Sequence, residues 1–317
     1  MIIDMPNATS AQIAKRLVTA REEGGAVALG RVLTLIIVTD GEDDEQAIRA
    51  ANEASAEHPM RVIVLELEPN ATRARLDAEI RLGGDAGASE VIRLHAIGGA
   101  AQQPETLVQA LLLPDAPVAI WWTDEHPAVP SSDPLGAIAQ RRITDVTEAD
   151  RAEQVCELCD RFAAGDSDLA WTRLTAWRSL LASVFDQPPF EPVERVTVRG
   201  KPGAATTRLM AAWLALALGV RVNLIEELEE AIPGRLRSIE IERAESRITL
   251  DRISATEVEL NQSGFPTQRL SLPLRDLTDL LAEELRSLAP DGVLGRVLRE
   301  GLPLVRIHEP VEHEDHD

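Results

Sequence analysis

Residues 30–67 read GRVLTLIIVTDGEDDEQAIRAANEASAEHPMRVIVLEL, and this stretch decides the fold. Its two ends are nearly continuous apolar runs, which is typical of strands that are buried on both faces of a sheet. Between them, residues 43–58 have the spacing of an amphipathic helix. A strand, a helix and a second strand in this order indicate a β-α-β unit with a parallel crossover.

The segments outside this unit predict two mixed lobes. Residues 73–84 and 88–96 alternate apolar and polar side chains around a glycine-rich turn, as half-exposed antiparallel strands do. In the second half, a nearly all-apolar helix at 205–219 precedes three alternating strands that form a probable meander within residues 236–261. The predicted fold class is therefore α/β, with two α/β lobes of mixed parallel and antiparallel sheet flanked by helices, Rossmann-like in shape. The expected domains are residues 1–165, residues 166–307 and a disordered acidic tail, 308–317.

The amino-acid composition of the chain indicates which kinds of partner it can bind. The chain has 317 residues, with 32 basic and 53 acidic side chains and a net charge of −21. A surface this acidic repels phosphate backbones and anionic lipids, so we expect neither nucleic acid nor membrane as a partner. The longest apolar run, residues 209–220, is shorter than the roughly 20 residues that a spanning helix needs. No secretion signal is recognisable at the N-terminus, so a cytoplasmic location is expected.

The nucleotide and metal signals are weak. Neither a Walker loop nor a G-x-G-x-x-G after a strand is present, and the first β-α turn carries the acidic sequence TDGEDDEQ. Acidic groups suit a helix N-terminus but repel a pyrophosphate. The tail histidines, His308, His313 and His316, are interpreted as solvated rather than metal-binding. We therefore expect no cofactor, no metal and no catalytic residue.

Two further motifs leave alternatives open. The sequence VRGKPGAATTR at 198–208 offers Arg199, Lys201 and Thr206 as weak phosphate-binding candidates, although an ordinary strand–turn–helix link is favoured. Cys156 and Cys159 form a C-x-x-C whose acidic neighbours raise rather than lower a thiol pKa. Packing cysteines are favoured there over a redox pair.

The stretch GDSDLAWTRLTAWRSLLASVFD at 165–186 concentrates aromatic side chains in a chain that has no Tyr. Helical spacing over 167–185 places Trp171 and Trp177 on one apolar face, with Arg173 and Arg178 within it or at its edge. Trp and Arg are enriched in protein–protein hot spots. The alternative is a core helix whose arginines reach solvent. Residue types alone do not decide between the two.

A family resemblance does decide the functional interpretation. Six segments occur in order that strongly resemble the OpcA family of actinobacterial glucose-6-phosphate dehydrogenase assembly proteins: GRVLTLIIVTD, HPMRVIVLELE, LDAEIRLGGDAGASEV, LLLPDAPVAIWW, DPLGAIAQRRITDV and AGDSDLAWTRLTAWRSLLASVFDQPPFEP. The similarity extends over residues 1–300 and is weaker after Lys201.

The resemblance implies a protein that is not an enzyme. It would bind glucose-6-phosphate dehydrogenase, promote its assembly or allosteric activation, and so support the oxidative pentose phosphate pathway and NADPH supply. The alternative is a regulatory domain that senses redox state or a phosphorylated metabolite, the latter through the 199–207 loop.

Within that hypothesis we expect a basic edge to mark the partner surface. Arg141 and Arg142, in QRRITD just after a loop, would join Arg173 and Arg178 beside the two tryptophans. The competing hypothesis is that these arginines pair internally with Asp145, Asp166 or Asp168.

Overall fold

A computed structural model of the chain describes residues 1–23, 32–41, 44–82, 90–146, 155, 159, 162–188, 190–227 and 234–308. The chain divides into two compact units, each with its own hydrophobic core. Unit 1 comprises Met1–Asp145, Ala163–Ser167 and Asp276–Pro290. Unit 2 comprises Val146–Phe162, Asp168–Arg275 and Asp291–Asp317. Both units are thus assembled from segments that are far apart in sequence.

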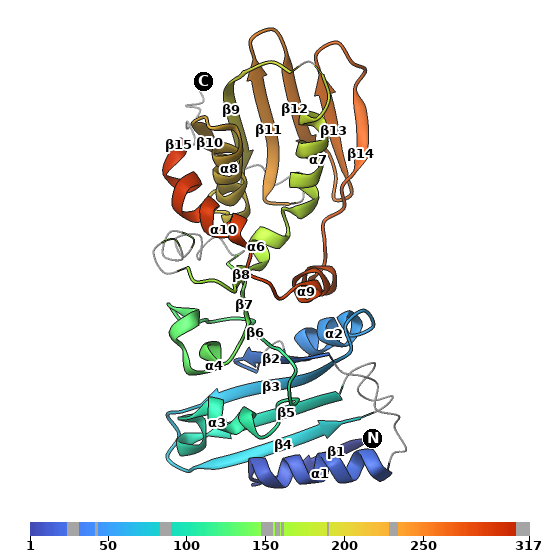
Figure 1. The fold of residues 1–317 in the computed structure, drawn as a ribbon, viewed down its shortest axis with the longest axis vertical. Coiled ribbons are helices and arrows are strands. Elements are labelled where there is room, and N and C mark those ends of the chain that lie inside the picture. Colours follow the sequence, from blue (N-terminus) through green and yellow to red (C-terminus); the bar gives the residue numbers. More distant parts are fainter. Residues whose placement is uncertain are drawn as a thin grey trace, which may run out of the picture. The chain divides into compact units, whose positions relative to one another are not determined.

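The first sheet has eight strands in the order β1-β4-β5-β3-β2-β6-β7-β8 (Figure 1). The run from β5 to β7 is parallel, whereas β4 is antiparallel to β5 and to β1. The predicted β-α-β unit and the predicted hairpin are both confirmed. The strands are β1 (Ile2–Met5), β2 (Leu33–Thr39), β3 (Met60–Glu68), β4 (Arg75–Arg81), β5 (Glu90–Ile97), β6 (Val118–Trp122), β7 (Arg141–Thr144) and β8 (Asp166–Asp168).

Helices cover this sheet because its central strands are apolar on both faces. Ile36 of β2 lies in one core cluster with Ile13 and Leu17 of α1, and Leu35 and Ile37, which point the other way, are also buried. Helix α2 packs against β3 and against α9. The helices are α1 (Ser10–Glu23), α2 (Asp44–Ala54), α3 (Pro104–Gln109), α4 (Pro134–Ala137) and α9 (Leu277–Arg286), with short 3-10 turns at Gly98–Ala101 and Pro130–Ser132.

The second sheet has seven strands in the order β14-β13-β12-β11-β9-β10-β15. Strands β9, β10 and β15 are parallel, and the remaining neighbours are antiparallel, which confirms the predicted meander. The mixed sheets of both units confirm the predicted α/β class. The strands are β9 (Val193–Gly200), β10 (Val222–Glu226), β11 (Leu236–Arg243), β12 (Arg247–Arg252), β13 (Glu257–Gln262), β14 (Gln268–Ser271) and β15 (Val305–His308).

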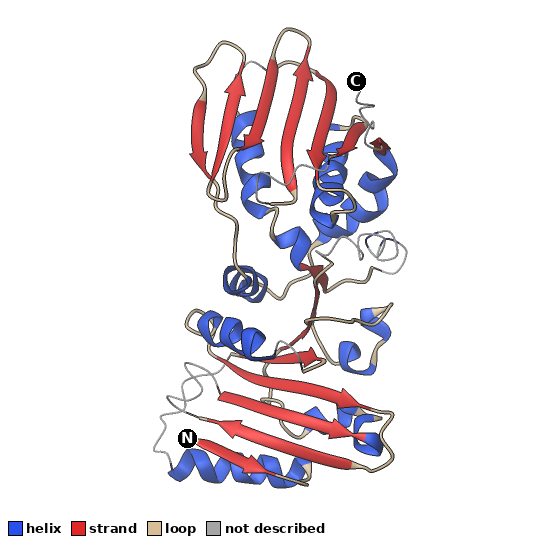
Figure 2. Cartoon of the chain, turned by 180° about the vertical axis from the view of Figure 1, so that it is seen from behind, coloured by secondary structure: helices blue, strands red, loops and turns tan. Residues whose placement is uncertain are grey.

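The described helices of unit 2 lie on one face of its sheet, behind the strands in Figure 2. Helix α8 is buried along most of its length, as its apolar sequence predicts, and it ends at Gly219 in the left-handed conformation (φ +67°). The opposite face carries the polar half of the strand alternation, for example Thr249 between Ile248 and Leu250. The helices are α6 (Leu169–Thr172), α7 (Thr175–Phe185), α8 (Ala205–Leu218) and α10 (Gly292–Arg296), followed by a π-helical segment at Val297–Gly301 and a 3-10 turn at Leu302–Leu304.

The continuous helix predicted over 167–185 is wrong. The segment begins as strand β8, and the Asp168 carboxylate then accepts from the Ala170 N–H at 2.8 Å and so caps α6. Arg173 and Leu174 separate α6 from α7. Among the described helices, none is both long and apolar enough to cross a membrane.

Candidate functional site

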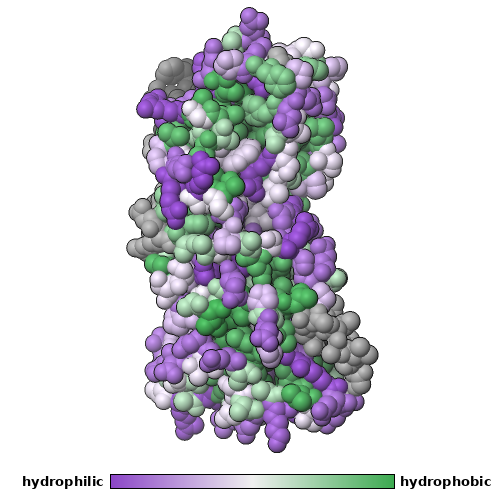
Figure 3. Space-filling model, viewed as in Figure 1, coloured by the Kyte–Doolittle hydropathy of each residue, from purple (hydrophilic) through white to green (hydrophobic). Residues whose placement is uncertain are grey.

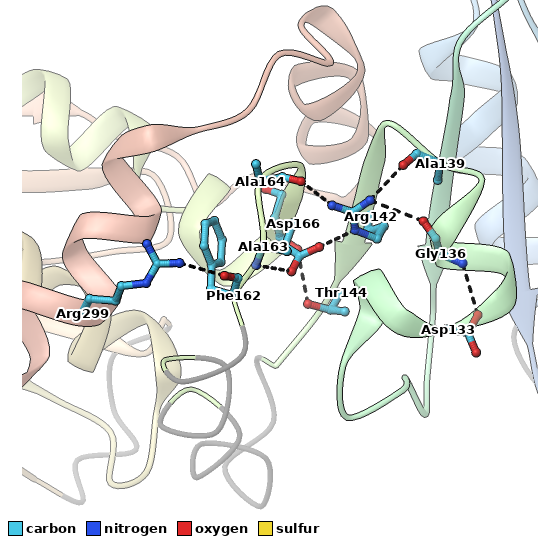
Figure 4. Close-up of polar contacts among 11 residues, drawn as sticks. Asp133, Gly136, Ala139, Arg142, Thr144, Phe162, Ala163, Ala164, Asp166 and Arg299 are labelled. Carbon is cyan, nitrogen blue, oxygen red and sulfur yellow. Dashed lines mark hydrogen bonds and ion pairs between the residues drawn. The ribbon is translucent and has the colours of Figure 1, made fainter.

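Arg142, one of the predicted interface residues, lies inside unit 1 (Figure 4). Its side chain is about 8% exposed and its Nε donates to the Asp166 carboxylate. Nη1 donates to the carbonyl oxygens of Ala139 at 2.8 Å and Gly136 at 3.3 Å, and Nη2 donates to the carbonyl of Ala164. Every nitrogen of the guanidinium therefore has a partner within the unit.

The local backbone is shaped around this guanidinium. Asp166 also accepts from the Ala163 N–H at 2.9 Å, which closes the short loop before β8. Gly165 has φ +95°, and a Cβ there would collide with the carbonyl oxygen of Gln140 and lie 2.8 Å from Nη2 of Arg142. Only glycine fits such a position without strain. The internal pairing of Arg142 with Asp166 is thus confirmed.

Arg141 is buried as well. Its Nη2 donates to the carbonyl oxygens of Ser287 at 2.5 Å and Ala289 at 2.9 Å, just beyond the end of α9. Its Nε lies 3.8 Å from the buried Glu284 carboxylate. All four residues of β7 are buried, so Arg141 and Arg142 lie inside the described structure, and their place at the edge of a partner surface stays a prediction. Sequence cannot show this, since the groups that satisfy Arg141 lie about 145 residues away along the chain.

The aromatic pair belongs to the core of unit 2. Trp171 is 2% exposed, and its Nε1–H donates to the Asp291 carboxylate at 2.7 Å. The guanidinium of Arg178 stacks 3.6 Å from the centre of the Trp171 ring, and its Nη2 donates to the Thr175 hydroxyl at 2.9 Å. Trp177 is also buried in this core. Whether Arg173 and Arg178, which are half-buried, contact a partner stays a prediction.

Two of the predicted residues, Arg173 and Trp177, line a cavity of about 230 Å³ in unit 2. The cavity is also lined by three arginines that come later in the sequence: Arg235, Arg252 and Arg275. Sequence reasoning missed these three. The available signal was the alternation of β12, which places an arginine at an inward position after Ile248 and Leu250.

The 199–207 loop does not gather its predicted phosphate ligands. Arg199 pairs with Glu240 at 3.2 Å and with Glu227 at 3.4 Å, and Lys201 is exposed. Thr206, by contrast, lies in the cavity wall, to which neither Arg199 nor Lys201 contributes. The basic groups of the loop are thus neutralised by the protein's own carboxylates or point to solvent.

The structure describes only some of the residues for which the cysteine and tail predictions were made. Cys159 is half-buried, and its Sγ lies 2.7 Å from the Leu298 carbonyl oxygen, as a packing role predicts. Cys156 lies outside the described residues, as do residues 309–317 with His313 and His316. His308 is the last residue of β15, with Nε2 3.1 Å from the Asn223 side-chain oxygen.

One cluster in unit 1 has the residue types of a metal site. The side chains of Glu66, Glu68 and His95 offer ligand atoms within 4.8 Å of one another. His95 Nε2 lies 2.7 Å from a Glu68 oxygen and 3.8 Å from one of Glu66. Pairing between adjacent strands β3 and β5 accounts for this grouping without a metal.

Ligands of doubly wound sheets bind where the strand order reverses, which here is between β2 and β6. The residues that follow these strands include Asp40 and Asp124, so the described part of that edge is acidic. Residues 42 and 43 of the predicted acidic turn lie outside the described residues. An acidic edge disfavours the pyrophosphate of a dinucleotide.

Comparison with protein families identifies the chain. The model described as the glucose-6-phosphate dehydrogenase subunit N-terminal domain matches residues 51–160, and the corresponding C-terminal domain matches residues 164–298. Two domains of a dehydrogenase-associated subunit thus account for most of the sequence. The chain belongs to the OpcA family of glucose-6-phosphate dehydrogenase assembly proteins.

Solved structures give only distant likenesses. Glucose-6-phosphate 1-dehydrogenase from Mycobacterium avium is 11% identical with a TM-score of 0.39, over 87% of this chain and 94% of that one. An oxidoreductase from Thermotoga maritima is 12% identical with a TM-score of 0.40, over 84% and 94%. A Gfo/Idh/MocA family oxidoreductase from Vibrio cholerae is 10% identical with a TM-score of 0.37, over the same shares. Likeness at this level carries no argument about activity. No curated protein matches the sequence.

Proposed function

We propose that this chain binds glucose-6-phosphate dehydrogenase and promotes assembly of its active state. The observation that carries the proposal is the match of two assembly-family domains across residues 51–160 and 164–298. Through that enzyme the chain supports the oxidative pentose phosphate pathway and NADPH supply in the cytoplasm. Its own net charge of −21 favours a partner with a basic docking surface.

The physical mechanism is thermodynamic linkage. A protein that binds the active form of the dehydrogenase more tightly than its other forms shifts the population toward the active form. A coupling free energy of about 1–3 kcal/mol changes that population by roughly 5–150-fold. Assembly and allosteric activation would then both result from one quantity, the difference between the chain's affinity for the active form of the dehydrogenase and its affinity for the other forms. Neither requires a reacting group on this chain.

Complex formation tests the proposal directly. The dehydrogenase from the same cell is mixed with this chain, and sedimentation velocity is measured together with specific activity over a range of dehydrogenase concentrations. We expect a complex, and an active oligomer that persists at about tenfold lower dehydrogenase concentration. A mixture that sediments as two independent species with unchanged activity would contradict the proposal.

The second part of the proposal is that the chain itself does not catalyse the oxidation of glucose 6-phosphate. The acidic edge between β2 and β6 supports this, because it disfavours the cofactor's pyrophosphate. The purified chain is expected to reduce neither NADP nor NAD with this substrate. Turnover that co-purifies with the chain through an affinity step that removes the dehydrogenase would refute it.

The contacted surface is proposed on the solvent side of α7, beside Arg173 and Arg178. Figure 3 shows hydrophilic and apolar side chains interspersed on the face that includes the helices of unit 2, so hydropathy alone does not mark an interface there. Ser183 is exposed on α7, whereas Thr249 lies on the opposite, strand side of the same sheet. These two positions form a matched pair for mutation.

Ser183→Arg is expected to weaken dehydrogenase binding about tenfold or more, because a large charged side chain obstructs close packing. Thr249→Arg introduces the same side chain on the other face and is expected to bind normally. Both variants are first checked for an unchanged melting temperature. The reverse pattern of binding would place the interface on the strand face and refute the α7 surface.

The alternative function, sensing of a phosphorylated metabolite, finds no support in the two basic residues of the 199–207 loop, Arg199 and Lys201. Arg199 is already paired with Glu227 and Glu240. Redox sensing has no supporting observation among the described residues either, where the Sγ of Cys159 lies 2.7 Å from the backbone carbonyl oxygen of Leu298.

A further inference from the structure

The cavity of unit 2 is strongly cationic. Its wall of about a dozen residues includes four arginines, Arg173, Arg235, Arg252 and Arg275, and no aspartate or glutamate among the described residues that line it. This is unusual in a chain with 53 acidic and 32 basic residues. Several guanidinium groups around one hollow offer hydrogen-bond donors that suit an anion.

Arg252 is the centre of this cavity wall. Its side chain is about 2% exposed, and its Nη1 donates to the carbonyl oxygens of Leu272 at 3.0 Å and Ser254 at 3.1 Å. Its guanidinium lies 5.2 Å from the centre of the Trp177 ring, and no described carboxylate pairs with it. Burial lowers the pKa of this guanidinium, which measures the cost of holding a charge there without a counter-charge. An anion in the cavity would remove that cost.

Thr206 gives a second, independent indication. It is 5% exposed, and its Oγ1 is buried without a hydrogen-bond partner among the described residues. It sits in the first turn of α8, whose N-cap residue, Ala204, has no side chain able to cap the helix. A buried hydroxyl without a partner is uncommon in folded proteins and indicates a missing ligand or water. Thr206 also lines the cavity, so this hydroxyl belongs to the same wall as the arginines.

We propose that this cavity binds a small anionic metabolite through a phosphate or carboxylate group. Arg252 and Thr206 donate to the anion, the other three arginines of the wall lie around it, and the Trp177 ring contacts the apolar part of the ligand. A volume of about 230 Å³ suits a small metabolite rather than a dinucleotide. Arg donors suit both phosphate and carboxylate, since their planar fork pairs with either.

This inference goes beyond dehydrogenase binding and is tested without the dehydrogenase. Isothermal titration calorimetry of the full chain at constant ionic strength uses two probes, inorganic pyrophosphate for the phosphate chemistry and citrate for the carboxylate chemistry. We expect saturable binding of at least one probe at one site per chain, with a raised melting temperature. The probe that binds identifies which of the two anionic groups the cavity prefers.

Three variants locate the site. Arg173→Gln, at a half-buried position in the wall, is expected to lower affinity about tenfold or more because a charge-assisted hydrogen bond is lost. Thr206→Val keeps the shape and removes the hydroxyl; it should weaken the probe several-fold while leaving the ligand-free melting temperature unchanged or higher. This variant avoids the ambiguity of replacing the buried Arg252. Lys201→Gln removes one charge outside the cavity and should change affinity less than twofold.

Several results would overturn the proposal. One is the absence of binding by both probes at millimolar concentration. Another is a loss of affinity in Lys201→Gln as large as in Arg173→Gln, because that pattern means unspecific attraction. A third is probe affinity that is unchanged in both Arg173→Gln and Thr206→Val. If neither probe binds but both cavity variants weaken the dehydrogenase complex, the cavity receives an acidic side chain of the protein partner and not a metabolite.

Discussion

Arg142 shows at the residue scale how one side chain can connect two separate loops. Its guanidinium bonds the turn around Gly136 and Ala139, the loop at Ala164 and the carboxylate of Asp166. Such a buried pair contributes less than its Coulomb attraction suggests, because both ions lose water. Removing one partner is nevertheless costly, since it leaves the other charge buried and unpaired.

Charge reversal at this position distinguishes a structural role from a partner contact. Arg142→Glu places a second carboxylate beside Asp166 and removes the donors of three carbonyls, so we expect a loss of about 3–5 kcal/mol in the stability of unit 1. Calorimetry measures the shift in the melting temperature. Arg195→Glu is the control, because its side chain is 63% exposed and its pair with Glu242 contributes about 0–1 kcal/mol. An unchanged melting temperature in Arg142→Glu, with weakened dehydrogenase binding, would restore Arg142 to the partner surface.

At the element scale, charged side chains connect helix α2 to the strands of unit 1. Glu45, in the first turn of α2, accepts from Arg81 of β4 at 2.7 and 3.2 Å and from Arg93 of β5 at 3.3 Å. The hydrogen bond from Arg81, helped by the positive charges of Arg81, Arg93 and Arg49, holds the pKa of Glu45 below its usual 4.5. The carboxylate is therefore stabilised in the folded chain relative to the unfolded chain.

The sign of the pH dependence follows from this depressed pKa. The contribution of Glu45 to stability is fully present above its unfolded pKa and is lost as pH falls through its folded pKa. Its size is small, because the Glu45 side chain is 58% exposed and solvent screens the pair. Arg81→Gln is expected to raise the pKa of Glu45 toward its usual value in a carboxyl NMR titration. Arg75→Gln, on the same strand but paired with Asp77, is the control and should leave that pKa unchanged. A Glu45 pKa that does not move in Arg81→Gln would refute the assigned cause.

At the scale of the whole molecule, the principal feature is that each unit consists of segments that do not follow one another in the sequence. Unit 1 includes α9, although this helix follows the meander of unit 2 in sequence. The apolar side chains of α9, Leu280, Leu281 and Leu285, are buried, and α9 packs on α2. A cut at the predicted boundary after residue 165 would remove this helix from the unit that it covers.

Fragments test the boundary. A fragment of residues 1–165 is expected to melt well below the same fragment fused through a long Gly/Ser linker to residues 276–290, because burying each leucine contributes about 1.5–3 kcal/mol. Thermal unfolding by circular dichroism measures the difference. The matched control is the fusion carrying Leu280→Glu and Leu285→Glu, which should behave like the bare fragment. Equal melting of the bare fragment and the intact fusion would support the contiguous domain 1–165.

The sequence by itself determined the local elements and the family of this protein. The β-α-β run at 30–67, the hairpin around residues 83–87 and the apolar helix α8 all follow from the pattern of apolar residues, which reports burial one element at a time. The six ordered segments also predicted the OpcA family that the domain matches show.

Only the tertiary structure decided which partners the buried polar groups of those elements find. Arg141 reaches carbonyls beyond α9, and a break at Arg173 and Leu174 divides a helix that periodicity predicts as continuous. Four arginines from separate parts of the sequence line one cavity, although none of them adjoins another along the chain. The physical reason is that a buried polar group is specified by its partners, and those partners lie far along the chain, where no local pattern records them.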